Sequence, residues 1–397
     1  MAALRILHVV PYYEHAWAHG GIPRAVTTLT RALARRGHHV TVCTTDAGDA
    51  HRRAPADGDA TPGLAVHAFR NLSNALAYRY QLFLPLGLLR HVRSLCDSVD
   101  IAHLHACRNL PVAGAARALA RAGIPYVLSP HGTAPRIERR FLAKRFFDAS
   151  FGRNFLENAT RILAVSEAER RQLEALGTPS ARITVLPNAI DEREFEPPPD
   201  GARFRRAHGL GDGPLVLLLA KLTPRKRADL LIQAFRRLRT PDTRLVIAGS
   251  DMQSGATREL TRRDSRITSV GVLTGRERLD ALAAASVLAY PSTDEVFGLV
   301  PIEALLAGTP VIVSNDSGAG EIIGRIGGGH IVPSGDVESL AGAIDSMLSD
   351  ISLWQQRART AALRARLAFG ADAVAERFDA LYHEVLGRHV AQDRRTA

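Results

Sequence analysis

Two acidic residues frame a short glycine-containing turn in the stretch DEVFGLVPIEALLAGTPVIV. Glu295 and Glu303 are its two glutamates, and seven residues separate them. Carboxylates are poor partners for phosphate but accept hydrogen bonds from hydroxyl groups. A helix should open between them, and the first backbone N–H groups, those of Gly298, Leu299 and Val300, should attract an anion. Phe297, just before this turn, is also expected to contact the ligand. The pattern indicates a ligand that carries a diphosphate between two polyols, as a nucleotide sugar does.

Cations that could neutralise a diphosphate occur in a second stretch, AKLTPRKRADLLIQAF. Lys221 and Lys226 flank a Thr-Pro turn that follows an apolar run, and a helical pattern comes next. The alternative is a solvated basic start of a helix, but cations at that position oppose the helix dipole. We therefore expect Lys226 and Lys221 to contact phosphate groups.

Short apolar runs alternate with helical patterns along the whole chain, and these elements must position the charged residues. The apolar runs cover residues 4–10, 39–45, 101–105, 124–129, 162–165, 183–186, 215–220, 244–248, 267–270, 287–290 and 311–313. Such alternation predicts parallel sheets with helices on both faces. A chain of 397 residues also exceeds what one hydrophobic core usually serves. The predicted fold class is α/β, with two doubly wound Rossmann-like domains that face each other across a cleft.

The domain boundaries follow from composition. We expect an N-terminal domain over residues 1–190 and a linker over 191–213, which is charged and contains three consecutive prolines. A C-terminal domain should cover 214–370, and a helix over 371–397 should cross back to the first domain. Loops at the carboxyl ends of parallel strands would line the cleft.

Charge and cysteine content narrow the class of protein. The net charge of +11 indicates an anionic partner or merely reflects solvated, arginine-rich helices, and both readings stay open. The three cysteines show no CxxC spacing, which disfavours disulfide and zinc frameworks and favours a reducing compartment. The N-terminus is typical of a buried strand rather than a signal peptide, and the apolar runs are too short to span a bilayer. We expect a cytoplasmic protein.

Together, these motifs resemble the family 4 glycosyltransferases of the GT-B fold. The segments that carry the resemblance are HGGIPRAVTTLTRALARRGHHVTVCT, DIAHLHA, SPHGTAPR, LAVSEAER, VLPNAIDEREF, AKLTPRKRADLLIQAF, LVIAGS and DEVFGLVPIEALLAGTPVIVS. The last segment contains the E-x7-E signature of the family. The resemblance covers nearly the whole chain and implies a retaining transferase that uses a nucleotide-diphosphate sugar, without a cofactor and without a metal.

The resemblance also implies roles for individual residues. Glu295 resembles the acid that binds the hydroxyls of the donor sugar, and Glu303 the acid that binds the ribose. Lys226 resembles the family lysine on the diphosphate. Lys221 stands where the family usually has arginine, which keeps the charge but loses the bidentate fork.

Val296 and Arg227 stand where the family often has glycine, which puts the local shape of both loops in question.

Two loops of the first half are expected near the donor. Gly20 and Gly21 precede a helical pattern, and glycine allows close approach of the backbone to a ligand, although a plain turn is the alternative. His131, in SPHG, follows an apolar run and resembles the family histidine that approaches the donor sugar. Asn188, in LPNAID, resembles the interdomain loop of the family.

His103 and His105 lie in the strand sequence DIAHLHA. We expect their rings to point to opposite faces of the strand, so that they do not form a metal pair. Whether one of them lines the cleft or both are structural stays open.

The acceptor is expected to be a glycan or a lipid-linked saccharide, in the biosynthesis of a cell-surface glycan, glycolipid or exopolysaccharide. Two segments could contact it or an anionic membrane: residues 134–155, where phenylalanines mix with Arg and Lys, and residues 78–92. The first segment could equally be a core-facing stripe under a basic face. We expect an enzyme that contacts the inner face of the membrane peripherally.

Other functions compete with this prediction. A nucleotide-sugar epimerase of the same fold and glycosylation of a soluble small molecule stay open, whereas the retention of both Glu295 and Glu303 argues against an inactive homologue. Nucleic-acid binding is disfavoured because aromatic residues make up only 6% of the chain and no nucleic-acid motif occurs. The loop at Gly20 also lacks the GxGxxG pattern of dinucleotide-binding dehydrogenases.

Overall fold

The computed structural model of the chain describes residues 2–55, 60–135, 154–250 and 264–396, with side chains for all of these except 154, 155 and 390–396. The chain divides into two compact units. Unit 1 comprises Met1–Ala189 and Ala371–Ala397, and unit 2 comprises Ile190–Gly370. Within the described ranges, no helix combines the length and apolar character needed to cross a bilayer.

Seven parallel strands form the sheet of unit 1, in the order β3-β2-β1-β4-β5-β6-β7. The strands are β1 (Arg5–Val9), β2 (His39–Thr45), β3 (Leu64–Phe69), β4 (Ile101–His105), β5 (Tyr126–Ser129), β6 (Arg161–Ala164) and β7 (Ile183–Val185). Successive side chains of β1 enter different cores: Ile6 packs on one face, and Leu7 and Val9 on the other. Burial on both faces explains why the central strands are continuous apolar runs.

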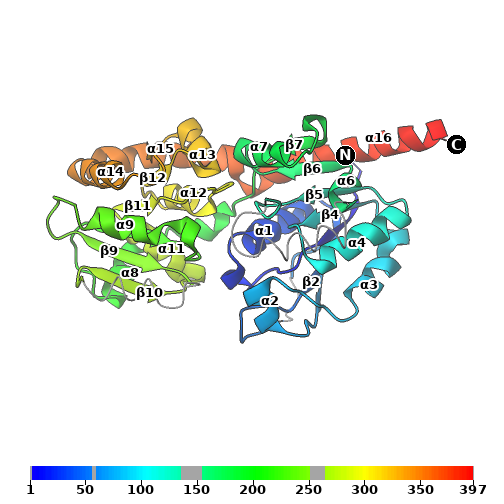
Figure 1. Ribbon diagram of the computed structural model, residues 1–397, viewed down its shortest axis with the longest axis horizontal. Coiled ribbons are helices and arrows are strands. Elements are labelled where there is room, and N and C mark those ends of the chain that lie inside the picture. Colours follow the sequence, from blue (N-terminus) through cyan, green and yellow to red (C-terminus); the bar gives the residue numbers. More distant parts are fainter. Residues whose placement is uncertain (1, 56–59, 136–153, 251–263, 397) are drawn as a thin grey trace. The chain divides into compact units, whose positions relative to one another are not determined.

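Helices cover both faces of this sheet. The face of Ile6 packs against α1 (Ile22–Arg35) and α16 (Ala371–Thr396), and the opposite face against α3 (Leu88–Leu95) and α4 (Leu110–Arg121). The first and last helices of the chain therefore lie side by side (Figure 1), with an ion pair of 3.4 Å between Arg36 and Asp379. The other α-helices in the described part of unit 1 are α2 (Asn74–Tyr80), α6 (Asn154–Glu157) and α7 (Glu167–Ala175).

Six parallel strands form the sheet of unit 2, in the order β10-β9-β8-β11-β12-β13. The strands are β8 (Leu215–Leu219), β9 (Arg244–Ala248), β10 (Ile267–Gly271), β11 (Val287–Tyr290), β12 (Val311–Ser314) and β13 (Gly329–Val332). The helices are α8 (Gly201–Ala207), α9 (Ala228–Phe235), α11 (Gly275–Ala284), α12 (Leu299–Leu306), α13 (Gly318–Ile326), α14 (Val337–Ser349) and α15 (Ile351–Phe369). Residues 191–213, expected to form a linker, contain α8, which packs on α11 through a 2.7 Å hydrogen bond from Arg203 to Asp280.

Both sheets are doubly wound, as the sequence predicts, so the predicted fold class is confirmed at the level of two α/β sheets with helices on both faces. In each sheet the strand order reverses beside its first strand, at β1/β4 in unit 1 and at β8/β11 in unit 2. Loops at such a switch point separate as they leave the sheet and form the usual ligand site of open α/β folds. The next question is whether the candidate residues of each unit lie at this edge of its sheet.

Candidate active site

The candidate active site of unit 2 lies where the strand order of its sheet reverses. The loop after β8 carries Lys221 and Lys226, and the loop after the neighbouring strand β11 carries Glu295. The two loops are joined directly, because the backbone N–H of Thr293 donates a hydrogen bond of 2.9 Å to the carbonyl of Arg225. The switch point therefore brings the predicted lysines and the first predicted glutamate to one end of the sheet.

Lys226, Glu295 and Tyr290 form a closed triangle of polar contacts. The Lys226 ammonium forms an ion pair with Glu295 and donates a hydrogen bond of 2.6 Å to the Tyr290 hydroxyl. That hydroxyl in turn donates to Glu295 Oε2 at 3.0 Å. The side chains of Lys226 and Glu295 are only 14% and 18% exposed, so little water screens their charges.

Each member of this triangle shifts the pKa of the others. Burial opposes the charge on Lys226, but the adjacent Glu295 carboxylate and Tyr290 outweigh it and hold the lysine pKa above its usual value. Burial likewise opposes ionisation of Glu295, yet Lys226 beside it keeps the pKa of that carboxyl lowered. Burial, together with the Glu295 charge, raises the pKa of Tyr290 to about 12. At neutral pH the site thus holds a cation, a carboxylate and a neutral phenol.

Helix α12 begins next to this triangle, at the glycine that the sequence singles out. Gly298 precedes the helix with φ +79°, a left-handed conformation that favours glycine, and a Cβ at this position would lie 2.8 Å from the Cβ of Ala319. Phe297 is buried edge-on against Phe369. Leu299 and the partly exposed Val300 form the first turn, whose backbone N–H groups have no intrahelical partners.

Glu303 lies one turn further into α12 and is fully buried. Its Oε2 accepts a hydrogen bond of 2.5 Å from Arg278 of α11, and the same guanidinium contacts Glu194 at 2.5 Å. The two glutamates of the E-x7-E pair therefore have different cationic partners: Lys226 for Glu295 and Arg278 for Glu303.

Two of the three departures from the family pattern near this site are Arg227 and Lys221. Arg227 adopts φ +50°, a left-handed conformation, which gives a physical reason for glycine at that position in the family. Lys221 lies two residues beyond β8 and is partly buried.

In unit 1, His131 follows β5 and adopts φ +51°. Its Nε2 lies 3.1 Å from Nδ1 of His105, and burial lowers the pKa of His131 to about 4. The backbone next to it is fixed by Glu169, a fully buried residue whose carboxylate accepts hydrogen bonds from the N–H groups of Gly132 and Val165. Burial raises the pKa of Glu169 to about 7 even though both of these hydrogen bonds oppose the shift.

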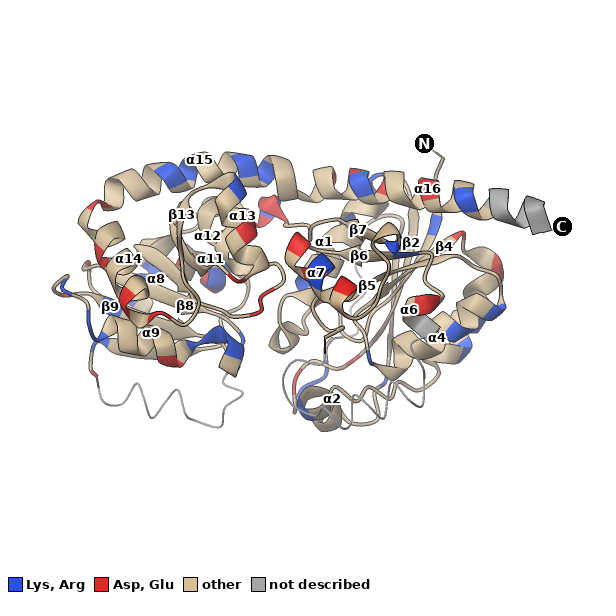
Figure 2. Cartoon of the chain, turned by 45° about the horizontal axis from the view of Figure 1, so that its top comes forward, with Lys and Arg blue, Asp and Glu red and all other residues tan. Residues whose placement is uncertain are grey.

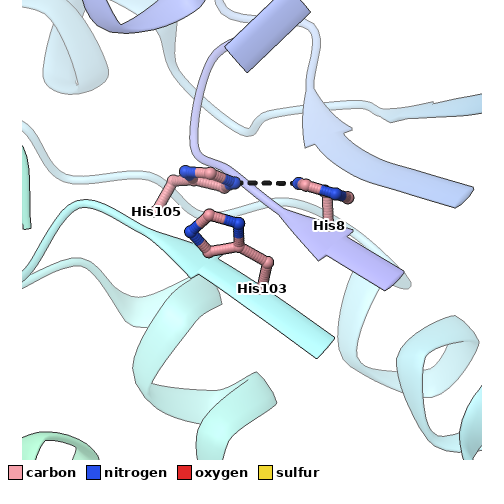
Figure 3. Close-up of side chains that lie close together, drawn as sticks. All are labelled: His8, His103 and His105. Carbon is pink, nitrogen blue, oxygen red and sulfur yellow. Dashed lines mark hydrogen bonds between the residues drawn. The ribbon is translucent and has the colours of Figure 1, made fainter. Parts of the chain in front are cut away.

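The prediction that His103 and His105 point to opposite faces of their strand is wrong. Residues two apart along a strand share a face, and the two ring centroids lie 3.9 Å apart. His8, on the neighbouring strand β1, joins them on that face, as Figure 3 shows.

The loop with Gly20 and Gly21 leads from β1 into α1. Gly20 has φ +103° but has open space where a Cβ would lie, so its conformation rather than crowding requires glycine. Gly21 caps α1 with φ −79°, which other residues adopt freely. The preceding His19 is buried and stacks on Tyr12, with ring centroids 4.6 Å apart.

Comparison with known proteins decides the family. Residues 19–194 match the family described as Glycosyltransferase Family 4, and residues 201–364 match Glycosyl transferases group 1. A D-inositol 3-phosphate glycosyltransferase of Xylanimonas cellulosilytica is 31% identical over 389 residues, which is 90% of this chain and 88% of the relative. The chain belongs to glycosyltransferase family 4.

Two further relatives describe the breadth of this similarity. A GDP-mannose-dependent alpha-(1-6)-phosphatidylinositol monomannoside mannosyltransferase of Mycolicibacterium smegmatis is 32% identical over 207 residues, 49% of this chain and 54% of the relative. The structure of Anabaena HepE in complex with UDP and glucose has a TM-score of 0.73 at 19% identity and covers 96% of this chain and 100% of that chain. This likeness confirms the predicted GT-B fold.

As a family 4 glycosyltransferase, the protein is an enzyme of the hexosyltransferase type that takes its sugar from a nucleotide sugar and retains the anomeric configuration.

Three residues that sequence reasoning missed complete the two sites. Tyr290 ends a predicted strand beside the Glu295 loop, where a tyrosine has the same pattern as a core residue. Glu169 belongs to a Ser-x-x-Glu pattern with Ser166, which is typical of a helix start, but the pattern does not reveal the contact with Gly132. Arg278 gave no signal, because its pairing with Glu303 depends on how α11 packs against α12.

Proposed function

We propose that this enzyme transfers a hexosyl-type sugar from a UDP- or GDP-type donor to a hydroxyl group of a cell-surface glycan, glycolipid or exopolysaccharide precursor. The observation that carries the donor part is the Lys226–Glu295–Tyr290 triangle at the switch point, next to the start of α12. A cation and the N–H groups at the start of a helix can bind a diphosphate, and a carboxylate can accept hydrogen bonds from the hydroxyl groups of a sugar.

The proposed donor contacts follow from these groups. Lys226 and the N–H groups of Gly298, Leu299 and Val300 would bind the diphosphate, with Lys221 as a further cation. Glu295 would accept hydrogen bonds from the sugar hydroxyls. Because the two loops are already hydrogen-bonded to each other, the donor would meet a preformed arrangement.

Glu303 is proposed as the ribose partner. Arg278 takes Oε2, and the proposal assigns the ribose contact to Oε1. The ion pair with Arg278 would hold the carboxylate ionised and oriented, which suits an acceptor of hydroxyl hydrogen bonds.

The chemistry would rest on leaving-group stabilisation. Negative charge develops on the diphosphate as the glycosidic bond breaks, and Lys226 together with the α12 N–H groups would stabilise it. The acceptor hydroxyl would attack from the same face of the sugar. His131, Gly20 and Gly21 are proposed as further residues that contact the donor.

Thermal-shift screening with UDP-, GDP- and ADP-sugars tests the donor proposal, followed by incubation of the stabilising donor with and without acceptor extracts. We expect one donor class to raise the Tm of wild type but not of Lys226→Ala, and the transferred sugar to keep its anomeric configuration. If no nucleotide sugar stabilises the protein, the proposal fails. Consumption of the donor alone, with an epimerised sugar as product, would support the epimerase alternative instead.

For the acceptor side, we propose that unit 1 binds an anionic membrane surface through a defined apolar patch. Five large apolar side chains from one short segment are exposed, half of the ten that are exposed among the described residues: Leu72, Leu76, Tyr80, Leu82 and Leu86. We call these five residues the 72–86 patch. A monomeric enzyme rarely exposes so many neighbouring apolar side chains without a partner.

The patch is presented by an ordered loop rather than by loose chain. The N–H of Leu72 donates to the carbonyl of Leu84 at 3.1 Å, and the N–H of Leu86 donates to Arg70 at 2.9 Å, which closes the loop around α2. Phe83 and Ala77 anchor it in a small core beneath.

Charge favours an anionic lipid surface as the partner. From Thr61 to Cys96 the chain contains four arginines and no acidic residue, and α2 carries no red segment in Figure 2. Apolar side chains flanked by arginines fit the boundary between headgroups and acyl chains. The predicted segment 78–92 overlaps the patch only in part, because Tyr80, Leu82 and Leu86 are exposed but Phe83 is buried. The other predicted segment, 134–155, lies largely outside the described residues.

Flotation with vesicles tests this surface. Wild type should float with vesicles that contain anionic lipid at low salt, and Leu72→Ser/Leu86→Ser should not. The matched control is Leu363→Ser/Leu367→Ser, which removes two exposed leucines from α15, a helix that also carries basic bands (Figure 2). No binding of wild type at low salt, or equal binding of the patch variant, would refute the membrane proposal and favour a soluble acceptor.

A further inference from the structure

Unit 1 contains a row of hydrogen-bonded histidines that ends at His131. Nδ1 of His8 lies 2.9 Å from Nε2 of His105 (Figure 3), and Nδ1 of His105 lies 3.1 Å from Nε2 of His131. The side chain of Asn188 lies near that of His131 and raises the pKa of His131, against the larger opposite effect of burial. His8 and His105 are fully buried at the switch point of the sheet, whereas His131 and Asn188 line a small pocket.

The hydrogen bonds along this row run in one direction, because each ring nitrogen can act as donor or acceptor but not both. His8 Nε2 is buried and has no hydrogen-bond partner among the described residues. A buried N–H without an acceptor is rarer and costlier than a bare acceptor, so the proton of His8 belongs on Nδ1. It then donates to His105, whose own proton must sit on Nδ1 and point at His131. His131 Nδ1 likewise has no hydrogen-bond partner within the described ranges, but His131 lines the pocket with Asn188, whereas His8 is fully buried. An N–H is therefore less costly at the pocket end of the row, and the proton of His131 belongs on Nδ1.

A metal site is the alternative reading of these rings. Nitrogen atoms of His8, His103 and His105 all lie within 4.8 Å of one another. However, both nitrogens of His103 are engaged, with the Tyr382 hydroxyl at 2.7 Å and the Ser129 hydroxyl at 2.8 Å. The ring centroids of His103 and His105 also lie 3.9 Å apart, with the ring planes tilted by 34°, whereas the nitrogen lone pair that binds a metal lies in the ring plane. The contacts favour a hydrogen-bond relay.

The hydrogen bonds of this row select one neutral tautomer of His131, and none of the rings carries an extra proton at pH 7. Burial lowers the pKa of His8 to about 3 and that of His131 to about 4, so every ring is neutral at pH 7. A proton passed inward would charge His8 in a dry interior, which is unfavourable.

We propose that His8 and His105 are positioning residues that fix His131 as the neutral Nδ1–H tautomer and orient its ring in the pocket with Asn188. The importance of this for transfer rests on the proposed function, in which His131 approaches the donor sugar. His131 has a left-handed backbone, so its ring needs support from the surrounding structure.

Nitrogen NMR of the full chain, labelled with 15N-histidine and without any ligand, tests the relay. Wild type should show a protonated, pyrrole-type Nδ1 and a bare, pyridine-type Nε2 at His131, assigned with His131→Asn. His8→Phe removes the donor at similar shape and should give mixed tautomers at His131. His8→Asn places an N–H near the Nδ1 position and should restore the wild-type pattern. An unchanged His131 spectrum in His8→Phe would overturn the proposal.

Kinetic measurements on the same variants distinguish an effect on the position of the His131 ring from an effect on the stability of the protein. We expect kcat of His8→Phe to fall by ~10- to 100-fold, as for small misplacements of a catalytic group, with the donor KM and the Tm nearly unchanged. His8→Asn should recover most of the loss. If the tautomer changes but wild type transfers no sugar, the relay stands and the proposed function fails. Absorption bands with Co²⁺ that vanish in His8→Phe would show a metal site and overturn the relay.

Discussion

At the scale of single residues, Lys226 and Glu295 illustrate how far residue type and spacing can be interpreted. Their charges and their order along the chain predict a diphosphate-sugar site, and the structure places them in contact. The third member, Tyr290, escaped prediction because a tyrosine at the end of an apolar strand has the same pattern as a core residue. Burial and hydrogen bonding, which depend on the whole sheet, give it its role.

Lys226→Ala should weaken binding of the nucleotide-sugar donor by roughly 10- to 100-fold, because a charged hydrogen bond contributes about 1.5–3 kcal/mol. Isothermal titration with the donor found by screening would measure this change. Arg237→Ala, which removes an exposed cation paired with Glu338, is the control and should bind like wild type. Equal affinity in the Lys226 variant would place the diphosphate elsewhere.

Glu169 predicts a pH dependence of the stability of unit 1. Its pKa rises on folding from 4.5 to about 7, so the native state binds the proton more tightly than the unfolded state. This contribution is fully present below about pH 4.5 and is lost as pH rises to about 7. At about 1.4 kcal/mol per pKa unit, wild type should lose roughly 2–3 kcal/mol more than Glu169→Gln between pH 5 and 8.

The two tryptophans allow this to be measured in one unit. Trp17 lies in unit 1 and Trp354 in unit 2. Urea unfolding followed by Trp17 fluorescence in a Trp354→Phe background would report unit 1. Parallel pH profiles of wild type and Glu169→Gln would contradict the assignment.

At the scale of elements, the central strands and the edge strands β7 and β10 were predicted, whereas the edge strands β3 and β13 were not. Central strands such as Val287–Tyr290 are buried on both faces and appear as apolar runs. β3 and β13 lie at sheet edges with several exposed side chains, so LAVHAF and GHIV lack the pattern of a buried strand. The start of α12, by contrast, could be located from Gly298 and the proline that follows it.

Gly298→Ala should destabilise unit 2 by about 1–2 kcal/mol from the left-handed backbone alone, with a further cost from the contact with Ala319. Adding Ala319→Gly to Gly298→Ala should remove only the cost of the contact with the Ala319 side chain. The matched control is Gly342→Ala in α14, where a Cβ meets nothing within 4 Å and the change should stabilise by about 0.5–1 kcal/mol. Trp354 fluorescence in a Trp17→Phe background measures all three, and a neutral Gly298→Ala would contradict the backbone argument.

Arg278 couples α11 to α12 and also contacts Glu194 near the start of unit 2. Arg278→Met should cost about 3–5 kcal/mol, because it leaves the buried Glu303 carboxylate without this cation. Glu194→Gln removes a partly exposed partner and should cost no more than about 1 kcal/mol. The double variant Arg278→Met/Glu303→Leu should be more stable than Arg278→Met, measured by the same fluorescence. A double variant that is no better would show that the ion pair is not the cause.

At the scale of the whole molecule, the two units share one architecture. Each unit is a doubly wound parallel sheet with its candidate residues at the switch point: the histidine row at β1/β4 and the Lys226–Glu295 triangle at β8/β11. The alternation of apolar runs and helices predicted both sheets, and the carboxyl ends of their strands predicted where chemistry would gather. Contacts between residues distant in sequence, such as His8 with His105 or Arg278 with Glu303, required the folded chain.

The most direct test of the central claim is a crystal structure of the enzyme with its nucleoside-diphosphate donor. The predicted result places the diphosphate within hydrogen-bond distance of Lys226 Nζ and of the first N–H groups of α12, with sugar hydroxyls donating to Glu295. A donor bound away from the β8/β11 switch point, with the Lys226–Glu295 pair undisturbed and remote from it, would contradict the account.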